Sequence, residues 1–131
     1  MSAAYTFALS KQERICSKKL IDELFTGNGR SMTAFPLRAV FMRRQRTAGE
    51  SQTAMLVSVP KRYFKRAVKR NRVKRQVREA FRRHKSILAS SLQADGDAVA
   101  VAFVWLSDTL LTTAEVERRM VRLMTRISES L

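Results

Sequence analysis

The segment 61–85 constrains the fold more than any other part of the chain, because it combines a helical apolar pattern with dense positive charge. Its apolar residues recur at helical spacing, at Val73, Val77, Ala80 and Phe81. This spacing places them on one stripe of a helix over about residues 63–86, and such a stripe must pack against a sheet or other helices. The segment therefore predicts a helix that docks on a core with one side and exposes charge on the other.

Half of the chain's 26 lysines and arginines lie in this segment, at Lys61, Arg62, Lys65, Arg66, Lys69, Arg70, Arg72, Lys74, Arg75, Arg78, Arg82, Arg83 and Lys85. Glu79 is the one acid among them. A charged face that merely meets solvent usually carries acids that pair with its bases at i±4, and unpaired like charges destabilise a helix. A net charge of +15 over 131 residues indicates an anionic partner: nucleic acid, an anionic membrane or an acidic protein. The cationic face of a well-patterned helix favours the phosphates of a nucleic acid.

Composition and length exclude several classes of protein. An apolar fraction of 45% can fill a core, and no repeat or linker divides the chain, so we predict a single domain over residues 1–131. The longest apolar run, 98–106, is far shorter than the about 20 residues of a membrane-spanning helix. One cysteine, Cys16, and one histidine, His84, leave no disulfide and no metal-ligand cluster. The N-terminus lacks the pattern of a secretory signal, which indicates a cytoplasmic location.

The rest of the chain predicts strands and two further helices. An amphipathic helix is predicted over 17–25, ended by two glycines. Apolar alternation predicts strands at 37–42, 54–59 and 98–105, the last in the interior of a sheet, with a hairpin connection at 43–53 between the first two. Thr112 begins a capping-box sequence that predicts the start of the last helix. This order of elements indicates an α+β sandwich with helices laid against one sheet.

The basic segment resembles the signature of one protein family. Its core is Arg70-Asn71-Arg72, followed by Lys74-Arg75 and by Arg78-Glu79-Ala80-Phe81. Within residues 58–82, this order is similar to that of the bacterial ribonuclease P protein subunit. Weaker similarity at Phe7, Arg14-Ile15, Leu24-Phe25, 35–38 and 97–103 extends the resemblance over about residues 7–126.

The resemblance implies a fold and a function. The fold would have a mixed central sheet of about four strands and an unusual left-handed β-α-β crossover through the basic helix, against the usual right-handed rule. The function would be that of a non-catalytic subunit that binds a catalytic RNA and the 5′ leader of precursor tRNA. The RNA and the substrate would hold the Mg²⁺ that supports removal of the leader. The protein would be monomeric in the holoenzyme, and no DNA or membrane partner is expected.

Site residues follow from the same resemblance. The positions that match the family's contacts to the catalytic RNA are Lys69, Arg70, Asn71, Arg72, Lys74, Arg75, Arg78 and Arg82. The leader would lie in a cleft between the basic helix and the sheet, at Ile21, Phe25, Phe35, Arg38, Val40, Lys61, Arg62 and Lys65. Ile21 and Arg38 stand where the family pattern has aromatic residues, whereas Phe25 and Phe35 can stack on bases. No residue of the protein is predicted to be catalytic or to bind a metal.

Two other functions are compatible with the charge pattern. A ribosomal or assembly protein without nuclease activity could use the same helix on structured RNA. A self-sufficient nuclease would need paired acids or a histidine with an acid, and the 11 acids of the chain are scattered along the sequence. An assay of precursor-tRNA cleavage distinguishes the three functions. A ribonuclease P subunit would improve cleavage by its RNA, a ribosomal or assembly protein would have no effect on it, and a self-sufficient nuclease would cleave alone.

Overall fold

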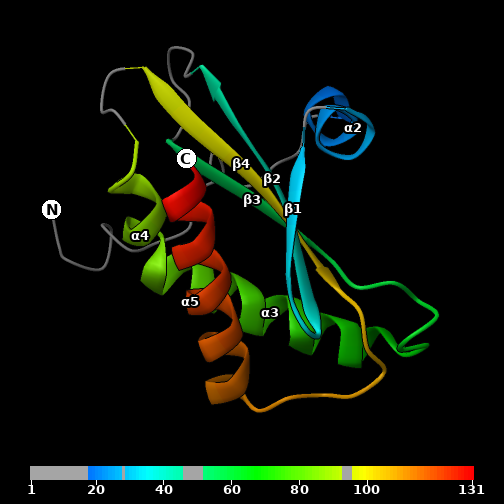
Figure 1. The fold of residues 1–131 in the computed structure, drawn as a ribbon. Helices are drawn as coiled ribbons and strands as arrows, with labels where there is room; N and C mark the ends of the chain where they lie inside the picture. The colour runs from blue at the N-terminus through cyan, green and yellow to red at the C-terminus, as the bar shows by residue number, and fades with distance from the viewer. Residues whose placement is uncertain (1–17, 28, 46–51, 93–95) are drawn as a thin grey trace, which may run out of the picture.

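A computed structural model describes residues 18–27, 29–45, 52–92 and 96–131. Its elements are α2 (Lys18–Thr26), β1 (Arg30–Ala34), β2 (Leu37–Gln45), β3 (Thr53–Ser58), α3 (Ala67–His84), α4 (Ser86–Ala89), β4 (Asp97–Trp105) and α5 (Thr113–Ser130). The sheet carries α3, α4 and α5 on one face and α2 on the other (Figure 1). The predicted α+β class and order of elements are confirmed.

The four strands form one mixed sheet in the order β1-β2-β4-β3. Both β1 and β4 pair with β2 in antiparallel fashion, whereas β3 and β4 run parallel and are connected through α3. The predicted hairpin between the strands at 37–42 and 54–59 is wrong, because β4 lies between them and takes the ladder hydrogen bonds on that side of β2. The interior position predicted for the strand at 98–105 is confirmed, and the left hand of the crossover stays a prediction.

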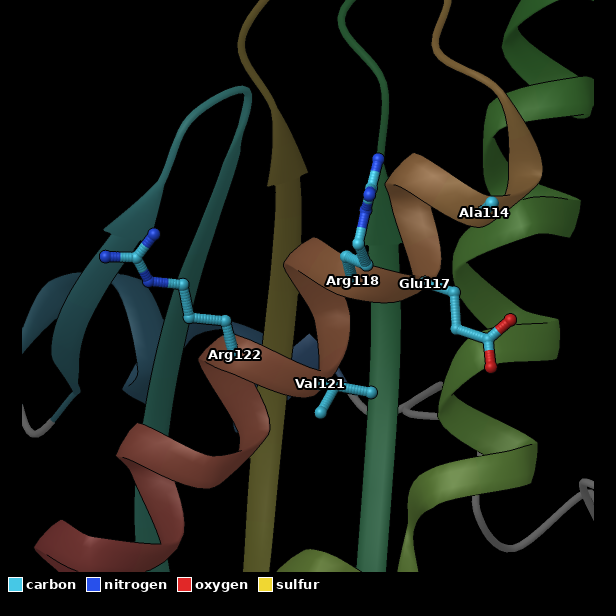
Figure 2. Close-up of a pocket in the computed structure, with 5 residues that line it drawn as sticks. All are labelled: Ala114, Glu117, Arg118, Val121 and Arg122. Carbon is cyan, nitrogen blue, oxygen red and sulfur yellow. The ribbon is translucent and has the colours of Figure 1, made fainter.

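The last helix begins as its sequence predicts. The Thr112 hydroxyl accepts a hydrogen bond from the backbone N–H of Glu115 at 3.2 Å, and the Glu115 carboxylate accepts one from the N–H of Thr112 at the same distance. Its buried stripe comprises Val116, Met120, Leu123, Met124 and Ile127. Figure 2 shows α5 in front of the strands with α3 beside it. The buried Gln76 of α3 donates to the carbonyl oxygen of Leu111 and to the hydroxyl of Thr113, which ties α3 to the start of α5.

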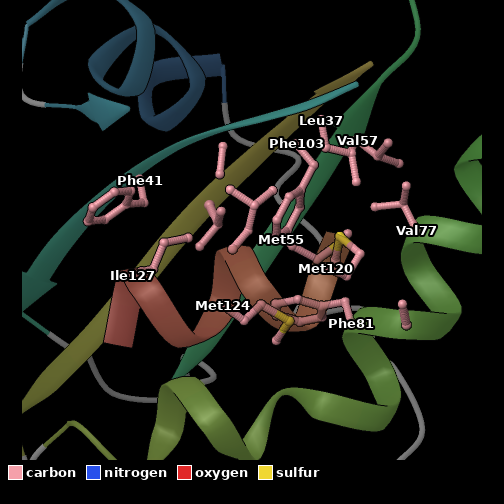
Figure 3. Packing of buried hydrophobic residues seen from close by; sticks show 14 of the residues in the cluster. Leu37, Phe41, Met55, Val57, Val77, Phe81, Phe103, Met120, Met124 and Ile127 are labelled. Carbon is pink, nitrogen blue, oxygen red and sulfur yellow. The ribbon is translucent and has the colours of Figure 1, made fainter. Parts of the chain in front are cut away.

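The larger core fills the space between the sheet and the helices α3 and α5. Alternate strand residues such as Phe41, Met55 and Phe103 point into it and meet side chains of both helices (Figure 3). The rings of Phe81 and Phe103 meet edge to face, with centroids 6.1 Å apart. The α3 residues that were predicted to dock, Val73, Val77, Ala80 and Phe81, are all buried here. Their burial determines which side of α3 faces solvent.

A smaller core lies between α2 and the opposite face of the sheet. Its buried residues are Leu24, Val40, Met42, Ala100 and Ala102. Gly29 permits the close packing at this point, because a β-carbon there would lie 2.1 Å from the carbonyl oxygen of Leu24 and 2.8 Å from the Val40 side chain. The helix predicted over 17–25 is thus held against the sheet by few side chains.

Candidate nucleic-acid interface

The solvent side of α3 carries all eight residues predicted to bind the catalytic RNA. They are exposed or half-buried, at Lys69, Arg70, Asn71, Arg72, Lys74, Arg75, Arg78 and Arg82; we call them the basic face of α3. Asn71, Arg75, Arg78 and Arg82 follow one another at helical spacing and form one row along the helix. The apolar stripe of α3 is buried against the sheet and α5, so the helix can present only this side to a ligand.

Most of the basic face has no counter-charge among the residues that the structure describes. Arg82 donates hydrogen bonds to both carboxylate oxygens of Glu79, which lowers the pKa of Glu79 below its usual value. Arg70 donates to the carbonyl oxygens of Phe64 and Lys65 at 2.7 and 2.8 Å, closing the turn before α3. The other six side chains make no hydrogen bond or ion pair with any residue that the structure describes. Five of these six are cations, and their mutual repulsion is left for an external anion to relieve.

A second set of cations lies in the turn between β3 and α3. Lys61, Arg62 and Lys65 are exposed there. The N–H of Tyr63 donates to the carbonyl oxygen of Pro60 at 3.1 Å, and the guanidinium of Arg62 lies 4.9 Å from the centre of the Tyr63 ring. With these three cations, positive charge extends from the start of α3 to the end of β3.

Phe35 and Arg38 lie at the same end of the sheet. The register pairs Arg38 with Val104 of β4, and Val104 with Ser58 at the end of β3. Phe35 is 65% exposed in the turn between β1 and β2, and its carbonyl oxygen accepts a hydrogen bond from Nε of Arg119 at 3.0 Å. Arg38 is exposed as well. We call this region, with Lys61, Arg62 and Lys65, the sheet end.

The other residues predicted to bind the leader lie on or under α2. Phe25 is 49% exposed and Ile21 is half-buried, whereas Val40 is 4% exposed and packs beneath the helix. The strand β1, with five residues or about 17 Å of extended chain, lies between the end of α2 and Phe35. Phe35 is therefore set apart from Phe25, whereas Arg38 lies two residues from Val40 on β2 and on the same face of the sheet.

The position predicted for the cleft is wrong. The space between α3 and the sheet is filled by Val73, Val77 and Phe81, which have no exposed surface. Val40 points to the opposite face of the sheet, toward Leu24. Any leader contact at Ile21, Phe25 or Val40 would thus be made on the α2 side of the sheet.

Two arginines that no sequence pattern singled out hold the hairpin of β1 and β2 against α5. Arg119 and Arg126 donate to the carbonyl oxygens of Phe35 and Thr33, at 3.0 and 3.3 Å. These partners are 84 and 93 residues apart in the chain. Only the three-dimensional arrangement could reveal them, because both arginines look like ordinary surface cations of a helix.

The groups near this surface are mainly cations, with one histidine. In the ranges that the structure describes, no three His, Cys, Asp or Glu side chains gather in a way that could hold a metal ion. The His84 ring lies 2.8 Å from Glu117, which also pairs with Arg83 at 3.5 Å, and these contacts join α3 to α5. Among the helices described, none is both long and apolar enough to span a membrane. The surface thus offers cations for phosphates and an exposed aromatic ring for a base.

Comparison with known sequences supports the motif. The family model described as Ribonuclease P matches residues 9–128. A ribonuclease P protein component from Porphyromonas gingivalis is 43% identical over 131 residues, covering 98% of this chain and 92% of that protein. Another from Chlorobaculum tepidum is 36% identical over 110 residues, covering 80% and 71%. The similarity includes the basic segment and the elements on both sides of it.

Comparison with solved structures supports the fold. The ribonuclease P protein of Staphylococcus aureus superposes with a TM-score of 0.67 at 19% identity, covering 88% of this chain and 94% of that one. The ribonuclease P protein of Thermotoga maritima gives a TM-score of 0.66 at 20% identity, covering 87% and 96%. The same fold is therefore reached with few residues in common.

Proposed function

The chain belongs to the ribonuclease P protein family, the protein component of a tRNA-processing ribonucleoprotein with an RNA partner, and from this premise we propose how its surfaces act. The basic face of α3 binds the catalytic RNA, and the sheet end binds the 5′ leader of precursor tRNA. The alternative of a ribosomal or assembly protein is not favoured by the comparisons.

The observation that carries this proposal is the uncompensated charge of α3. Five of the seven cations of its basic face have no internal partner among the residues described. Cations of this kind replace the counterions condensed on RNA, and the released counterions drive binding. Because two RNAs repel each other, a cationic adaptor between them also lowers the cost of bringing substrate to catalyst.

The leader is the second ligand in this proposal. Phe35 offers an exposed ring to an unpaired base, a contact of about 1–3 kcal/mol per stacked base. Arg38, Lys61, Arg62 and Lys65 supply positive charge for the adjoining phosphates. A single strand suits this sheet end because stacking needs bases that are not paired.

Bond breaking belongs to the RNA partner in this proposal. The protein has no catalytic group of its own, one copy acts in each complex, and the complex works in the cytoplasm. Mg²⁺ is held by the RNA and the substrate, and supports hydrolysis of the phosphodiester bond. The protein contributes by allowing the two RNAs to associate at a lower Mg²⁺ concentration.

Reconstitution with the catalytic RNA tests the proposal. Across a Mg²⁺ series, the protein should improve cleavage of precursor tRNA and selectivity over mature tRNA. A variant with Arg72, Lys74 and Arg75 changed to Gln should lose most of this effect at low Mg²⁺. The slope of log affinity against log salt concentration should be shallower by roughly 2–3, because each of the three lost phosphate contacts contributes about 0.7–0.9 to the slope.

Lys19→Gln is the matched control, because Lys19 is an exposed cation on α2, across the sheet from α3. It should keep the wild-type activity and salt dependence. A triple variant with unchanged slope and activity would overturn the assignment of the basic face. Cleavage by the protein alone would instead favour a self-sufficient nuclease.

A further inference from the structure

The outer face of α5 carries a second group of cations. Ala114, Glu117, Arg118, Val121 and Arg122 line a depression of about 500 Å³ on this face. In Figure 2, Glu117 points toward α3, whereas Arg122 points away from it and Arg118 lies between the two. Ala114 and Val121 are too small to fill the space beside the arginines. The depression therefore combines positive charge with a small apolar surface.

The arginines on α5 have two different environments. Arg119 and Arg126 are engaged with the hairpin of β1 and β2. Arg118 and Arg122 are exposed, and neither forms a hydrogen bond or ion pair with the residues described. They stand four residues apart on the same side of the helix, where like charges are unfavourable without an anion.

The nearby acids are occupied by other contacts. Glu115 completes the capping box with Thr112. Glu117 pairs with Arg83 and His84 across the contact with α3, and these partners lower the pKa of Glu117, so that it is ionised and engaged near neutral pH. The counter-charges closest in sequence to Arg118 are thus directed away from it.

We propose that the outer face of α5 is a second contact surface for the phosphodiester backbone of the catalytic RNA, centred on Arg118 and Arg122. The proposal rests on the proposed function and extends it from one helix to two. A guanidinium can hold a phosphate through two parallel hydrogen bonds. Ala114 and Val121 give the carbon atoms of an adjoining ribose an apolar surface. Because α5 packs beside α3, RNA on this surface continues from RNA on the basic face.

The catalytic RNA is the occupant because α5 is joined to α3, which carries the basic face, and the experiment tests the precursor tRNA as the competing assignment. A variant with Arg118 and Arg122 changed to Gln is tested for binding to the catalytic RNA alone, and for the KM of precursor tRNA with the assembled holoenzyme. Loss of two phosphate contacts should make the salt dependence shallower by about 1.5, and weaken the affected binding roughly tenfold. The variant with both arginines changed to Lys should keep the salt slope, because it keeps the charge.

The outcomes are distinct. Weaker binding to the catalytic RNA supports the proposal. A higher KM for precursor tRNA with unchanged binding to the catalytic RNA overturns the assignment to the catalytic RNA. The inference about α5 is wrong if the affinity for the catalytic RNA and the KM for precursor tRNA are both unchanged. The proposed function still stands in that case, provided that the triple variant of α3 shows a shallower dependence of affinity on salt. If the α3 variant is also unchanged, the proposed function fails as well. Thermal melting of the Gln variant should match wild type, because removal of two adjacent like charges does not weaken the helix.

Discussion

The two faces of the sheet are covered very differently. The face toward α3 and α5 buries large side chains, including Phe41, Phe81, Phe103 and Trp105. Among the residues described, the core on the α2 side comprises five buried residues, two of them alanines. A thick core on one side holds α3 in a fixed orientation, so its cations form a rigid row. The thin core on the other side leaves Ile21 and Phe25 partly exposed.

Phe81→Ala should be the most damaging single change, and it tests the thick core. Phe81 has no exposed surface and contacts the ring of Phe103. Removing a buried aromatic side chain leaves a cavity and costs about 3–5 kcal/mol. Denaturant unfolding should show this loss, together with weaker RNA binding as α3 loses its support. A loss below about 1 kcal/mol would show that the core under α3 is loosely packed.

Leu24→Ala applies the same test to the thin core. Leu24 is 1% exposed, and two of the buried residues it clusters with, Ala100 and Ala102, are small. We expect a loss of about 2–3 kcal/mol, at the lower end for such changes, because the site can partly collapse. Hydrogen exchange should quicken in α2 while α3 stays protected. Equal deprotection of both helices would contradict the separation of the two faces.

The helices were predictable because their signals are local. The stripe of α3 and the capping box of α5 each lie within a few turns of chain, and both are found as predicted. The sheet was less predictable, since pairing depends on residues far apart. β1 is short and polar, at Arg30–Ala34, and no apolar alternation marks it as a strand. The insertion of β4 between β2 and β3 likewise leaves no trace in either strand's own sequence.

The site residues were predictable where they share one helix, but not where their surroundings come from distant parts of the chain. Residues on α3 share one face because helical spacing alone decides it. Val40 shows the limit, since its burial depends on α2 folding over it from another part of the chain. Arg119 shows it as well, because its contact with the carbonyl oxygen of Phe35 crosses 84 residues. Spacing along one element predicts a face, but not what covers that face.

Phe35→Ala and Phe25→Ala compare the sheet end with the thin face. Phe35 is the more exposed ring and lies in the turn between β1 and β2, at the same end of the sheet as Arg38, whereas Phe25 lies on α2. We expect Phe35→Ala to weaken binding of precursor tRNA by about 1–2 kcal/mol, the loss of one stacked base, with little change for tRNA that lacks a leader. The KM of the holoenzyme for both substrates measures this. A larger effect from Phe25→Ala would place the leader on α2 instead.

Glu117→Gln should have the smallest effect, and it tests the contact between α3 and α5 on the thick face. Hydrogen bonding to His84 and the charge of Arg83 lower the pKa of Glu117, against the opposing effects of desolvation and of the charge of Glu79. A carboxylate with a lowered pKa in the folded state adds stability above its unfolded pKa, and this stability is lost as the pH falls through the folded value. Wild type should therefore be slightly more stable than Glu117→Gln at pH 7, and the two should converge as the pH falls below about 4.5. Unfolding measured from pH 7 to pH 3 checks this; a difference that persists at pH 3 would mean that Glu117 supports the helix pair by packing rather than by charge.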